Sequence, residues 1–220
     1  MRGLPDRFCC DEDLERIGYD GHSWRRDLER LRRDGPRPTT LELIDALRAE
    51  GVEGATIREI GAGVGVVHLA LLEAGAAQAV DVDASREYLA AAREEAEQRG
   101  LVGRVEYRYG DVVELAAELP PADIVAADAV VCCYPYLDRF LRALARLEPR
   151  LVGLTLPSDT WLMRLFQRVE NVYFALRRRP DRWYLHRHRD IDEIMDGLGY
   201  VAAHRGGPWY GRVLVYRRAA

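Results

Sequence analysis

The stretch Glu59–Gly65, which reads EIGAGVG, decides the fold of this chain. Its first two residues end a short apolar and β-branched run, Thr56–Ile60. Its last two residues open a helix-period segment over residues 64–73. Glycines at such a junction let the backbone turn sharply and approach a ligand, while the free N–H groups at a helix start attract an anionic group. The spacing departs from the usual dinucleotide pattern G-x-G-x-x-G, so the loop alone does not separate a ligand site from a plain turn.

Outward from this loop, short apolar runs alternate with helix-period segments, as in a parallel sheet with helical crossovers. Strands are predicted at Thr56–Ile60, Ala79–Val82, Val105–Tyr109, Ile124–Ala127, Leu151–Leu156, Tyr200–Ala203 and Val213–Tyr216. Helices are predicted over residues 64–73, 86–98 and 137–147. The sequence therefore predicts an α/β fold with a doubly wound, Rossmann-like sheet, helices on both faces, and ligand sites outside the carboxyl ends of the strands.

The residues before the first strand predict two helices. Apolar side chains recur at helical spacing ahead of Gly35, and Thr39–Glu42 matches a capping box at the start of a second helix. We predict that residues 1–54 form an N-terminal helical cap and that residues 55–220 form the main domain, the whole being one structural domain.

The segment from Ser158 to Arg178 carries a wide apolar stripe at helical spacing. The stripe consists of Trp161, Leu165, Val169, Val172 and Leu176. A stripe of this width predicts a helix that packs against another part of the protein. The periodicity favours a helix that covers the sheet, and the alternative is a lid over an apolar substrate.

Acidic residues follow the second and third predicted strands. Asp83 comes after the glycine loop at the spacing of about 20 residues at which a carboxylate meets ribose hydroxyls in nucleoside-binding folds. Asp111, preceded by Gly110, stands where an adenine amino group would be met. Each aspartate alone is equally well explained as the N-cap of the following helix. Together, at the ends of successive strands, they favour an adenosine site.

These segments resemble the class I S-adenosylmethionine-dependent methyltransferases over about residues 55–157. The resemblance implies a seven-stranded sheet whose last strand runs antiparallel, with S-adenosylmethionine as cofactor. It also implies that the glycine loop contacts the methionine end, that Asp83 holds the ribose and that Asp111 contacts adenine. The residues expected at the cofactor are Glu59, Gly61, Ala62, Gly63, Gly65, Asp83, Ala84, Gly110, Asp111 and Asp128.

Two weaker resemblances concern the acceptor side. Residues 130–135, VVCCYP, are similar to a segment of small bacterial methyltransferase-like proteins. Tyr184–His186 and Trp209–Arg217 are loosely similar to magnesium-protoporphyrin O-methyltransferases, without a specific motif. That likeness does not carry a porphyrin substrate over to this chain.

Methyl transfer from a sulfonium is an in-line displacement, so the protein mainly holds donor and acceptor in contact and excludes water. In this family the end of the fourth strand faces the methyl group, which places Asp128 and Tyr134 near the reaction. Tyr134-Pro135 lacks the polar residue and second proline of the motif of amino-group methyltransferases, so O-methylation of a small molecule is the default. His186 is the candidate general base, because a neutral imidazole removes protons near neutral pH. A solvent-exposed basic turn is the alternative for His186.

The composition excludes several classes of function. All 32 basic residues are arginine, so a lysine Schiff base, a lysine general base and a P-loop lysine are ruled out. The net charge of −4 argues against a dedicated nucleic-acid binder, whose face would be strongly basic. We find no apolar stretch of membrane-spanning length and no secretory signal, and therefore expect a cytoplasmic protein with no nucleic-acid or membrane partner. The oligomeric state is not indicated.

The cysteines form two adjacent pairs, Cys9-Cys10 and Cys132-Cys133, which is not the spacing of a zinc site. We expect reduced thiols that act as small hydrophobic residues, with binding of a soft metal by both pairs as the alternative. His186 and His188, with Asp190, lack a further ligand of supporting spacing, so no metal site is predicted.

The sequence thus predicts an S-adenosylmethionine-dependent methyltransferase that acts on a small-molecule acceptor, with oxygen as the favoured atom. A nicotinamide-dependent oxidoreductase stays open as the alternative, because the same sheet and ribose acid would serve it. A non-catalytic protein that binds an adenosyl ligand is the third candidate. The acceptor is not identified by any motif.

Overall fold

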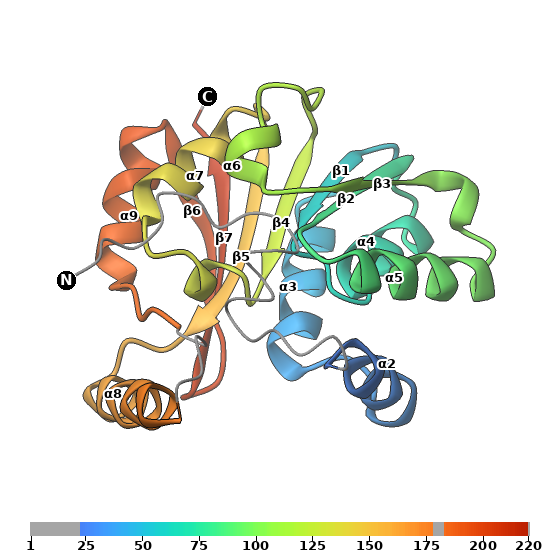
Figure 1. Cartoon of the computed structure of the whole chain (residues 1–220). Coiled ribbons are helices and arrows are strands. Elements are labelled where there is room, and N and C mark those ends of the chain that lie inside the picture. Colours follow the sequence, from blue (N-terminus) through green and yellow to red (C-terminus); the bar gives the residue numbers. More distant parts are fainter. Residues whose placement is uncertain (1–22, 178–182, 220) are drawn as a thin grey trace.

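A seven-stranded mixed sheet forms the centre of the computed structural model, which describes residues 23–177 and 183–219 (Figure 1). In chain order the strands are β1 (Thr56–Ile60), β2 (Gln78–Asp83), β3 (Val105–Tyr109), β4 (Ile124–Asp128), β5 (Leu151–Pro157), β6 (Tyr200–Gly206) and β7 (Gly211–Arg218). Across the sheet their order is β3-β2-β1-β4-β5-β7-β6. Strand β7 runs antiparallel to both neighbours, and the other adjacent pairs are parallel. The predicted sheet, with its antiparallel last strand, is confirmed.

Helices cover both faces of this sheet. The α-helices are α2 (Ser23–Asp34), α3 (Pro38–Ala49), α4 (Val66–Glu73), α5 (Arg86–Gln98), α6 (Val112–Leu115), α7 (Leu137–Ala145), α8 (Trp161–Leu176) and α9 (His188–Gly197), with short 3-10 helices η1 (Val102–Arg104) and η2 (Val131–Cys133). Helices α3, α4 and α5 share a core with one face, and α6, α7 and α9 share a core with the other. Two-sided coverage is the arrangement that the alternation of strands and helices predicted.

Burial on both faces explains why the central strands were legible in the sequence. In β4, Ile124 and Ala126 pack on the side of α3 and α4, whereas Val125 and Ala127 pack on the side of α7. All four side chains are fully buried. A strand covered on both faces therefore reads as a continuous apolar run and not as an alternating one.

Helix α3 starts differently from the prediction. It begins at Pro38 with no side-chain cap, so the capping box predicted at Thr39–Glu42 is wrong. Glu42 Oε1 instead accepts a hydrogen bond of 2.9 Å from the N–H of Gly207, which ties α3 to the β6–β7 connection. Leu43 packs in the same core as β1 and β5, so this part of the N-terminal segment is integral to the sheet's core.

Helix α8 does not cover the sheet, so the interpretation favoured by its periodicity is wrong. Figure 1 shows α8 and α2 beyond the same end of the sheet, where β5 finishes. The apolar stripe on α8 faces solvent, with Val169 60% and Leu176 80% exposed. Among the described residues, no helix combines the length and the apolar character needed to cross a bilayer.

Candidate functional site

The glycine loop joins β1 to α4 in a conformation that requires glycine. Gly61 has φ of +62°, and a Cβ there would lie 2.5 Å from Cγ2 of Val130. Gly65 has φ of +80°, and a Cβ there would lie 2.7 Å from Cε1 of His68. Both positions combine left-handed backbone with a close neighbour, which other residues do not tolerate. The loop therefore presents bare backbone at the end of β1.

A cavity of about 430 Å³ lies at the carboxyl ends of the parallel strands. Its walls are the glycine loop, the end of β2 and the segment after β4, with further residues from the N-terminal helices and from α8. The residues expected at the cofactor that line it are Gly61, Ala62, Gly63, Asp83, Ala84, Gly110 and Asp128. The topology thus brings most of the predicted set to one cavity, as expected for the carboxyl edge of such a sheet.

Asp83 is held in place by backbone donors. The N–H of Gly63 donates to Oδ2 of Asp83 over 3.1 Å, and the N–H of Ser85 donates to Oδ1 over 2.8 Å. Burial raises the pKa of Asp83 to about 6, although these two hydrogen bonds act in the opposite direction. Near neutral pH the group is therefore mostly ionised and able to accept further hydrogen bonds.

Glu59 lies beneath the loop, outside the residues that line the cavity. Its Oε2 accepts a hydrogen bond of 2.7 Å from the N–H of His68 and lies 2.7 Å from Nδ1 of the same residue. Both side chains are fully buried. Glu59 thus fixes the first turn of α4, in which His68 is an interior residue.

Asp111 also lies outside the cavity lining, although Gly110 contributes to it. Oδ1 of Asp111 accepts from the N–H of Val113 over 2.9 Å, so the side chain caps α6. The same oxygen accepts a 2.6 Å hydrogen bond from the Tyr134 hydroxyl. Burial raises the pKa of Asp111. The capping alternative that was open for this residue describes its observed contacts.

Asp128 and Tyr134 both line the cavity, and both side chains form hydrogen bonds with other residues of the protein. Oδ2 of Asp128 accepts a 2.6 Å hydrogen bond from the hydroxyl of Thr40 in α3. Oδ1 accepts from the hydroxyl of Thr155 in β5. The Tyr134 ring packs against Phe140 with 4.4 Å between centroids, while its hydroxyl donates to the α6 cap. These contacts fix both side chains in the cavity wall.

His186 lies behind the segment that follows β4, outside the residues that line the cavity. Its Nε2 is 2.8 Å from the carbonyl oxygen of Tyr134, and a carbonyl only accepts, so Nε2 carries the proton. Burial lowers the pKa of His186. The neutral imidazole therefore stabilises the cavity wall by its hydrogen bond to the Tyr134 carbonyl and does not line the cavity itself.

The neighbouring polar groups form no metal site. His188 Nδ1 lies 3.2 Å from Oδ1 of Asp159, and its Nε2 lies 3.2 Å from the carbonyl oxygen of Pro157. Within residues 23–177 and 183–219, no group of three or more His, Cys, Asp or Glu side chains is placed to hold a metal ion. Cys9 and Cys10 lie outside the described residues.

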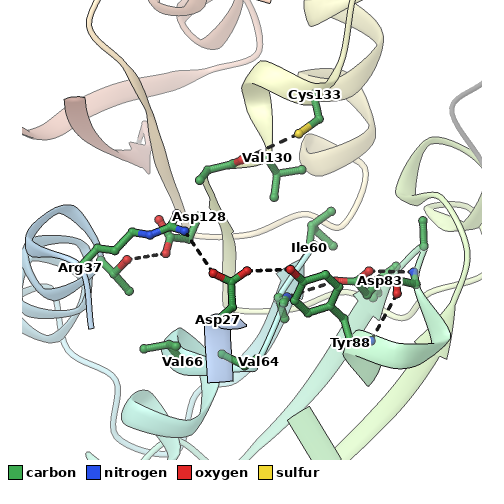
Figure 2. A pocket seen from close by; sticks show the side chains of 18 of the residues that line it. Asp27, Arg37, Ile60, Val64, Val66, Asp83, Tyr88, Asp128, Val130 and Cys133 are labelled. Atoms are coloured by element: carbon green, nitrogen blue, oxygen red, sulfur yellow. Dashed lines mark hydrogen bonds and ion pairs between the residues drawn. The ribbon is translucent and has the colours of Figure 1, made fainter. Parts of the chain in front are cut away.

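Residues of α2 and of the connection to α3 form a wall of the cavity that no sequence motif predicted. Figure 2 shows the Asp27 carboxylate of α2 between Arg37 and the Tyr88 phenol. The Tyr88 hydroxyl donates to Oδ2 of Asp27 over 2.7 Å, and Arg37 lies 3.7 Å from Oδ1. Arg30 lines the cavity as well. Asp27 and Arg30 are polar members of an ordinary amphipathic pattern, and Arg37 lies in the connection between α2 and α3, so only the position of these residues in space reveals them.

The opposite wall is apolar and sulfur-bearing. It contains Cys133 from η2, Phe174 from α8 and Trp183 from the segment before α9. Cys132 and Cys133 are free thiols, and each sulfur faces the Ala129 carbonyl oxygen, at 3.5 Å and 3.9 Å. Phe174 lies in the segment for which the sequence left a lid over an apolar substrate open as the alternative. Trp183 follows that segment, and no sequence pattern indicated its contact with a cavity.

Comparison with known proteins finds methyltransferases. The family model described as Methyltransferase domain matches residues 58–148. The ribosomal protein L11 methyltransferase of Edwardsiella ictaluri (strain 93-146) is 34% identical over 94 residues, which are 42% of this chain and 32% of the relative. This match spans only about a third of the relative's length. It also covers less than half of this chain.

Solved structures agree over nearly the whole chain. Magnesium protoporphyrin IX methyltransferase from Synechocystis PCC 6803 with bound SAH has a TM-score of 0.75 at 20% identity, covering 95% of this chain and 100% of that one. An O-methyltransferase family protein from Burkholderia thailandensis has a TM-score of 0.70 at 16% identity, covering 96% of this chain and 63% of that one. The resemblance seen in the sequence is confirmed: the chain carries a methyltransferase domain and has the fold of the class I S-adenosylmethionine-dependent methyltransferases.

Proposed function

We propose that this chain binds S-adenosylmethionine in the cavity and transfers the methyl group to an oxygen atom of a small molecule. The observation that carries the proposal is that the Asp83 carboxylate and the bare backbone of Gly61–Gly63 face one cavity. Two structures of a protein with this fold are described with SAH and with SAM bound. The family match favours a methyltransferase over the nicotinamide-dependent alternative.

The residues present fit the cofactor. The N–H groups of Gly63 and Ser85 donate to the two oxygens of Asp83, and the N–H of Ala84 is a third backbone donor. A carboxylate has about four acceptor sites, so capacity is left for a ribose hydroxyl. Ile60, Val82 and Val112 give an apolar wall suited to an adenine ring. When bound, the cofactor supplies an electrophilic methyl group on a sulfonium. The protein's part is to orient the donor and acceptor and to exclude water.

The three predicted catalytic side chains are all committed to other contacts. Asp128 accepts from two hydroxyls, Tyr134 donates to a carboxylate, and His186 donates to a backbone carbonyl. We therefore propose positioning roles for them and an acceptor oxygen that is ionised by itself near neutral pH, such as a carboxylate or an acidic phenol. Arg30 and Arg37 in the cavity wall favour such an anionic acceptor.

Calorimetric titration tests the cofactor. We expect S-adenosylmethionine and S-adenosylhomocysteine to bind with one-to-one stoichiometry and NAD not to bind. Binding of NAD alone would replace the proposal with the oxidoreductase. Cofactor binding without transfer to any acceptor in a broad panel would favour the non-catalytic binding protein.

Transfer of a labelled methyl group tests the acceptor class. Matched panels of carboxylic acids, acidic phenols, neutral alcohols and amines are incubated with the chain, and Asp83→Ala serves as the cofactor-site control. We expect label in the acids or phenols only. Label confined to amines, or to an L11-type ribosomal protein, would overturn the small-molecule O-methyltransferase.

Two substitutions at His186 separate a positioning role from a general base. Glutamine can donate a hydrogen bond to the Tyr134 carbonyl, whereas alanine cannot. We expect His186→Gln to retain kcat within about threefold, because general-base catalysis is worth roughly 100-fold or more and is not used here. His186→Ala should raise KM for the acceptor. A collapse of kcat in both variants, with a lost pH limb, would restore the general base.

A further inference from the structure

Helix α8 is turned so that its polar side faces the protein. The side-chain amides of Gln167 and Asn171 donate to the carbonyl oxygen of Trp183 over 3.0 Å and 3.2 Å. The Trp183 indole N–H donates to Oε2 of Glu170 over 2.7 Å. Phe174, on the same side, reaches the cavity wall. An ordinary surface helix does the reverse and buries its apolar face.

The outward side of α8 is apolar along its whole length. Exposed fractions there run from 48% to 80%. The residues are Trp161, Leu162, Leu165, Phe166, Val169, Val172, Tyr173 and Leu176, which we call the outer face of α8. No other helix or strand of the described residues packs extensively on α8. Monomeric proteins rarely expose a contiguous apolar surface of this kind without a binding role.

Arginines border the outer face of α8. At 100° per residue, Arg168 lies along one edge and Arg177, the residue after the helix, lies along the other; both are exposed. The sequence continues with Arg178 and Arg179, outside the described residues. Glu170 is the one acid in the α8 sequence, and it is turned inward to Trp183. The border is therefore cationic on both sides.

The charge along the edges of the outer face of α8 distinguishes its two simplest binding partners, a second copy of the chain and an anionic lipid surface. A second copy placed face to face on α8 would set its arginine edges against those of the first, in either helix direction, with no acid on the outer face to pair with them. An anionic lipid surface offers phosphates at the level of the arginines and acyl chains beneath the apolar residues. This pattern of aromatic and aliphatic residues with an arginine border is that of helices that lie in a membrane interface.

A second aromatic group lies next to the start of α8. Trp209 is 71% exposed in the connection between β6 and β7. The following residue, Tyr210, accepts a 3.1 Å hydrogen bond at its carbonyl from the N–H of Ser158, three residues before α8. Exposed tryptophans are preferred at the level of lipid headgroups.

We infer that the outer face of α8 binds the surface of a lipid bilayer that contains anionic headgroups, with the helix lying in the plane of the interface. The sixteen residues of α8 are too few to cross a bilayer, so the contact is peripheral. The sequence predicted no membrane partner, and the orientation of α8 is the observation that changes this expectation. The inference does not depend on the proposed methyl transfer.

Co-sedimentation with vesicles tests the inference on the full chain. Vesicles of phosphatidylcholine mixed with phosphatidylglycerol are compared with phosphatidylcholine alone, at low and high salt. We expect binding to the mixed vesicles that weakens with salt and a blue shift of tryptophan emission that is smaller in Trp161→Phe. Absence of binding to mixed vesicles, or equal binding to both kinds, would overturn the inference.

Matched substitutions locate the contact. Arg168→Ala with Arg177→Ala should weaken binding about 25-fold, since each arginine near an anionic surface contributes about fivefold. The control pair, Arg48→Ala with Arg146→Ala, removes the same charge from exposed sites on α3 and after α7 and should leave binding unchanged.

Charges introduced into the apolar surface complete the test. Leu165→Glu with Val169→Glu should abolish vesicle binding, whereas Val201→Glu, on exposed β6, should not. An unchanged free energy of unfolding in urea shows that the fold of each variant is intact. Vesicle binding at the wild-type level by the α8 variants would overturn the inference. A dimer of the wild-type chain in sedimentation velocity would also overturn it, if the α8 variants are monomeric and the wild-type chain does not bind vesicles.

Discussion

The two sides of the cavity are built in opposite ways. The side that we propose for the cofactor, called the cofactor side, uses backbone: the loop at Gly61, the Asp83 carboxylate tied to that loop, and strand ends whose register fixes them. The side that we propose for the acceptor, called the acceptor side, uses side chains from distant segments, such as Arg37, Phe174 and Trp183, joined by hydrogen bonds between α8 and residue 183. A short motif specifies the first side, whereas the second depends on how far-apart helices meet. Substitutions on the two sides should therefore differ in kind and in size.

The largest effect is expected in the glycine loop. Gly61→Ala forces alanine into left-handed backbone, at about 1–2 kcal/mol, and overlaps Val130, at about 1–3 kcal/mol. We expect the free energy of unfolding in urea to fall by about 2–5 kcal/mol, with loss of cofactor binding. Gly100→Ala is the control, because Gly100 has φ of +69° but nothing within 4 Å of a Cβ. Equal losses in both variants would contradict the role given to Val130.

Asp83 comes next on the cofactor side. Asp83→Ala should weaken the binding of S-adenosylmethionine by about 1–3 kcal/mol, the cost of unpairing hydrogen bonds to a charged group, as measured by calorimetry. Asp81→Asn is the matched control on the same strand, because Asp81 is fully buried and does not line the cavity. Unchanged affinity in Asp83→Ala would show that the ribose is held elsewhere.

Lowering the pH should weaken the same contact. With a pKa of about 6, Asp83 is about one tenth ionised at pH 5, so we expect about tenfold weaker cofactor binding at pH 5 than at pH 7. Stability should move the other way. The folded pKa exceeds the unfolded value of 3.8, so the native state binds more protons between about pH 4 and 6, and this group stabilises the fold as pH falls through that range. Asp83→Asn should flatten both dependences; a slope kept in that variant would assign the titration to another group.

The smallest effect is expected on the outer face of α8. Leu165→Ala with Val172→Ala should change the free energy of unfolding by less than about 1 kcal/mol, because both side chains already face solvent. Leu144→Ala, in the fully buried core at α7, should cost about 2–5 kcal/mol in the same urea experiment. A large fall in the free energy of unfolding of the α8 variant would show that the outer face of α8 supports the fold.

Sequence patterns predicted the sheet well and the acceptor side poorly. The predicted strands all form, because two-sided burial leaves continuous apolar runs that turn residues interrupt. The apolar stripe of α8 was assigned to the sheet, since periodicity reports that a helix has an apolar face but not the direction in which that face points. The capping box failed for a related reason: the helix begins at Pro38, and Glu42 accepts a hydrogen bond from the distant Gly207 and not from the local backbone.

The candidate site divides along the same line. Most residues expected at the cofactor line the cavity, but Glu59 and Asp111 serve the starts of α4 and α6. Short-range spacing places a carboxylate at a strand end and does not tell whether it turns toward the ligand or toward the next helix. Asp27 was missed because polar residues on an amphipathic helix look alike until packing places one side of the helix over a cavity. Arg37 was missed because it lies in the connection between α2 and α3, where no sequence pattern applies.

The amino-acid order by itself determined the sheet, the glycine loop and the place of Asp83, because continuous apolar runs and glycines at the ends of strands can be recognised in short stretches of sequence. Only the tertiary structure decided that the side chains of Asp128, Tyr134 and His186 are hydrogen-bonded within the protein. It also decided that α8 exposes its apolar side to solvent. Those outcomes depend on contacts between segments far apart along the chain. Their energies are set by which partners the fold brings within hydrogen-bonding distance.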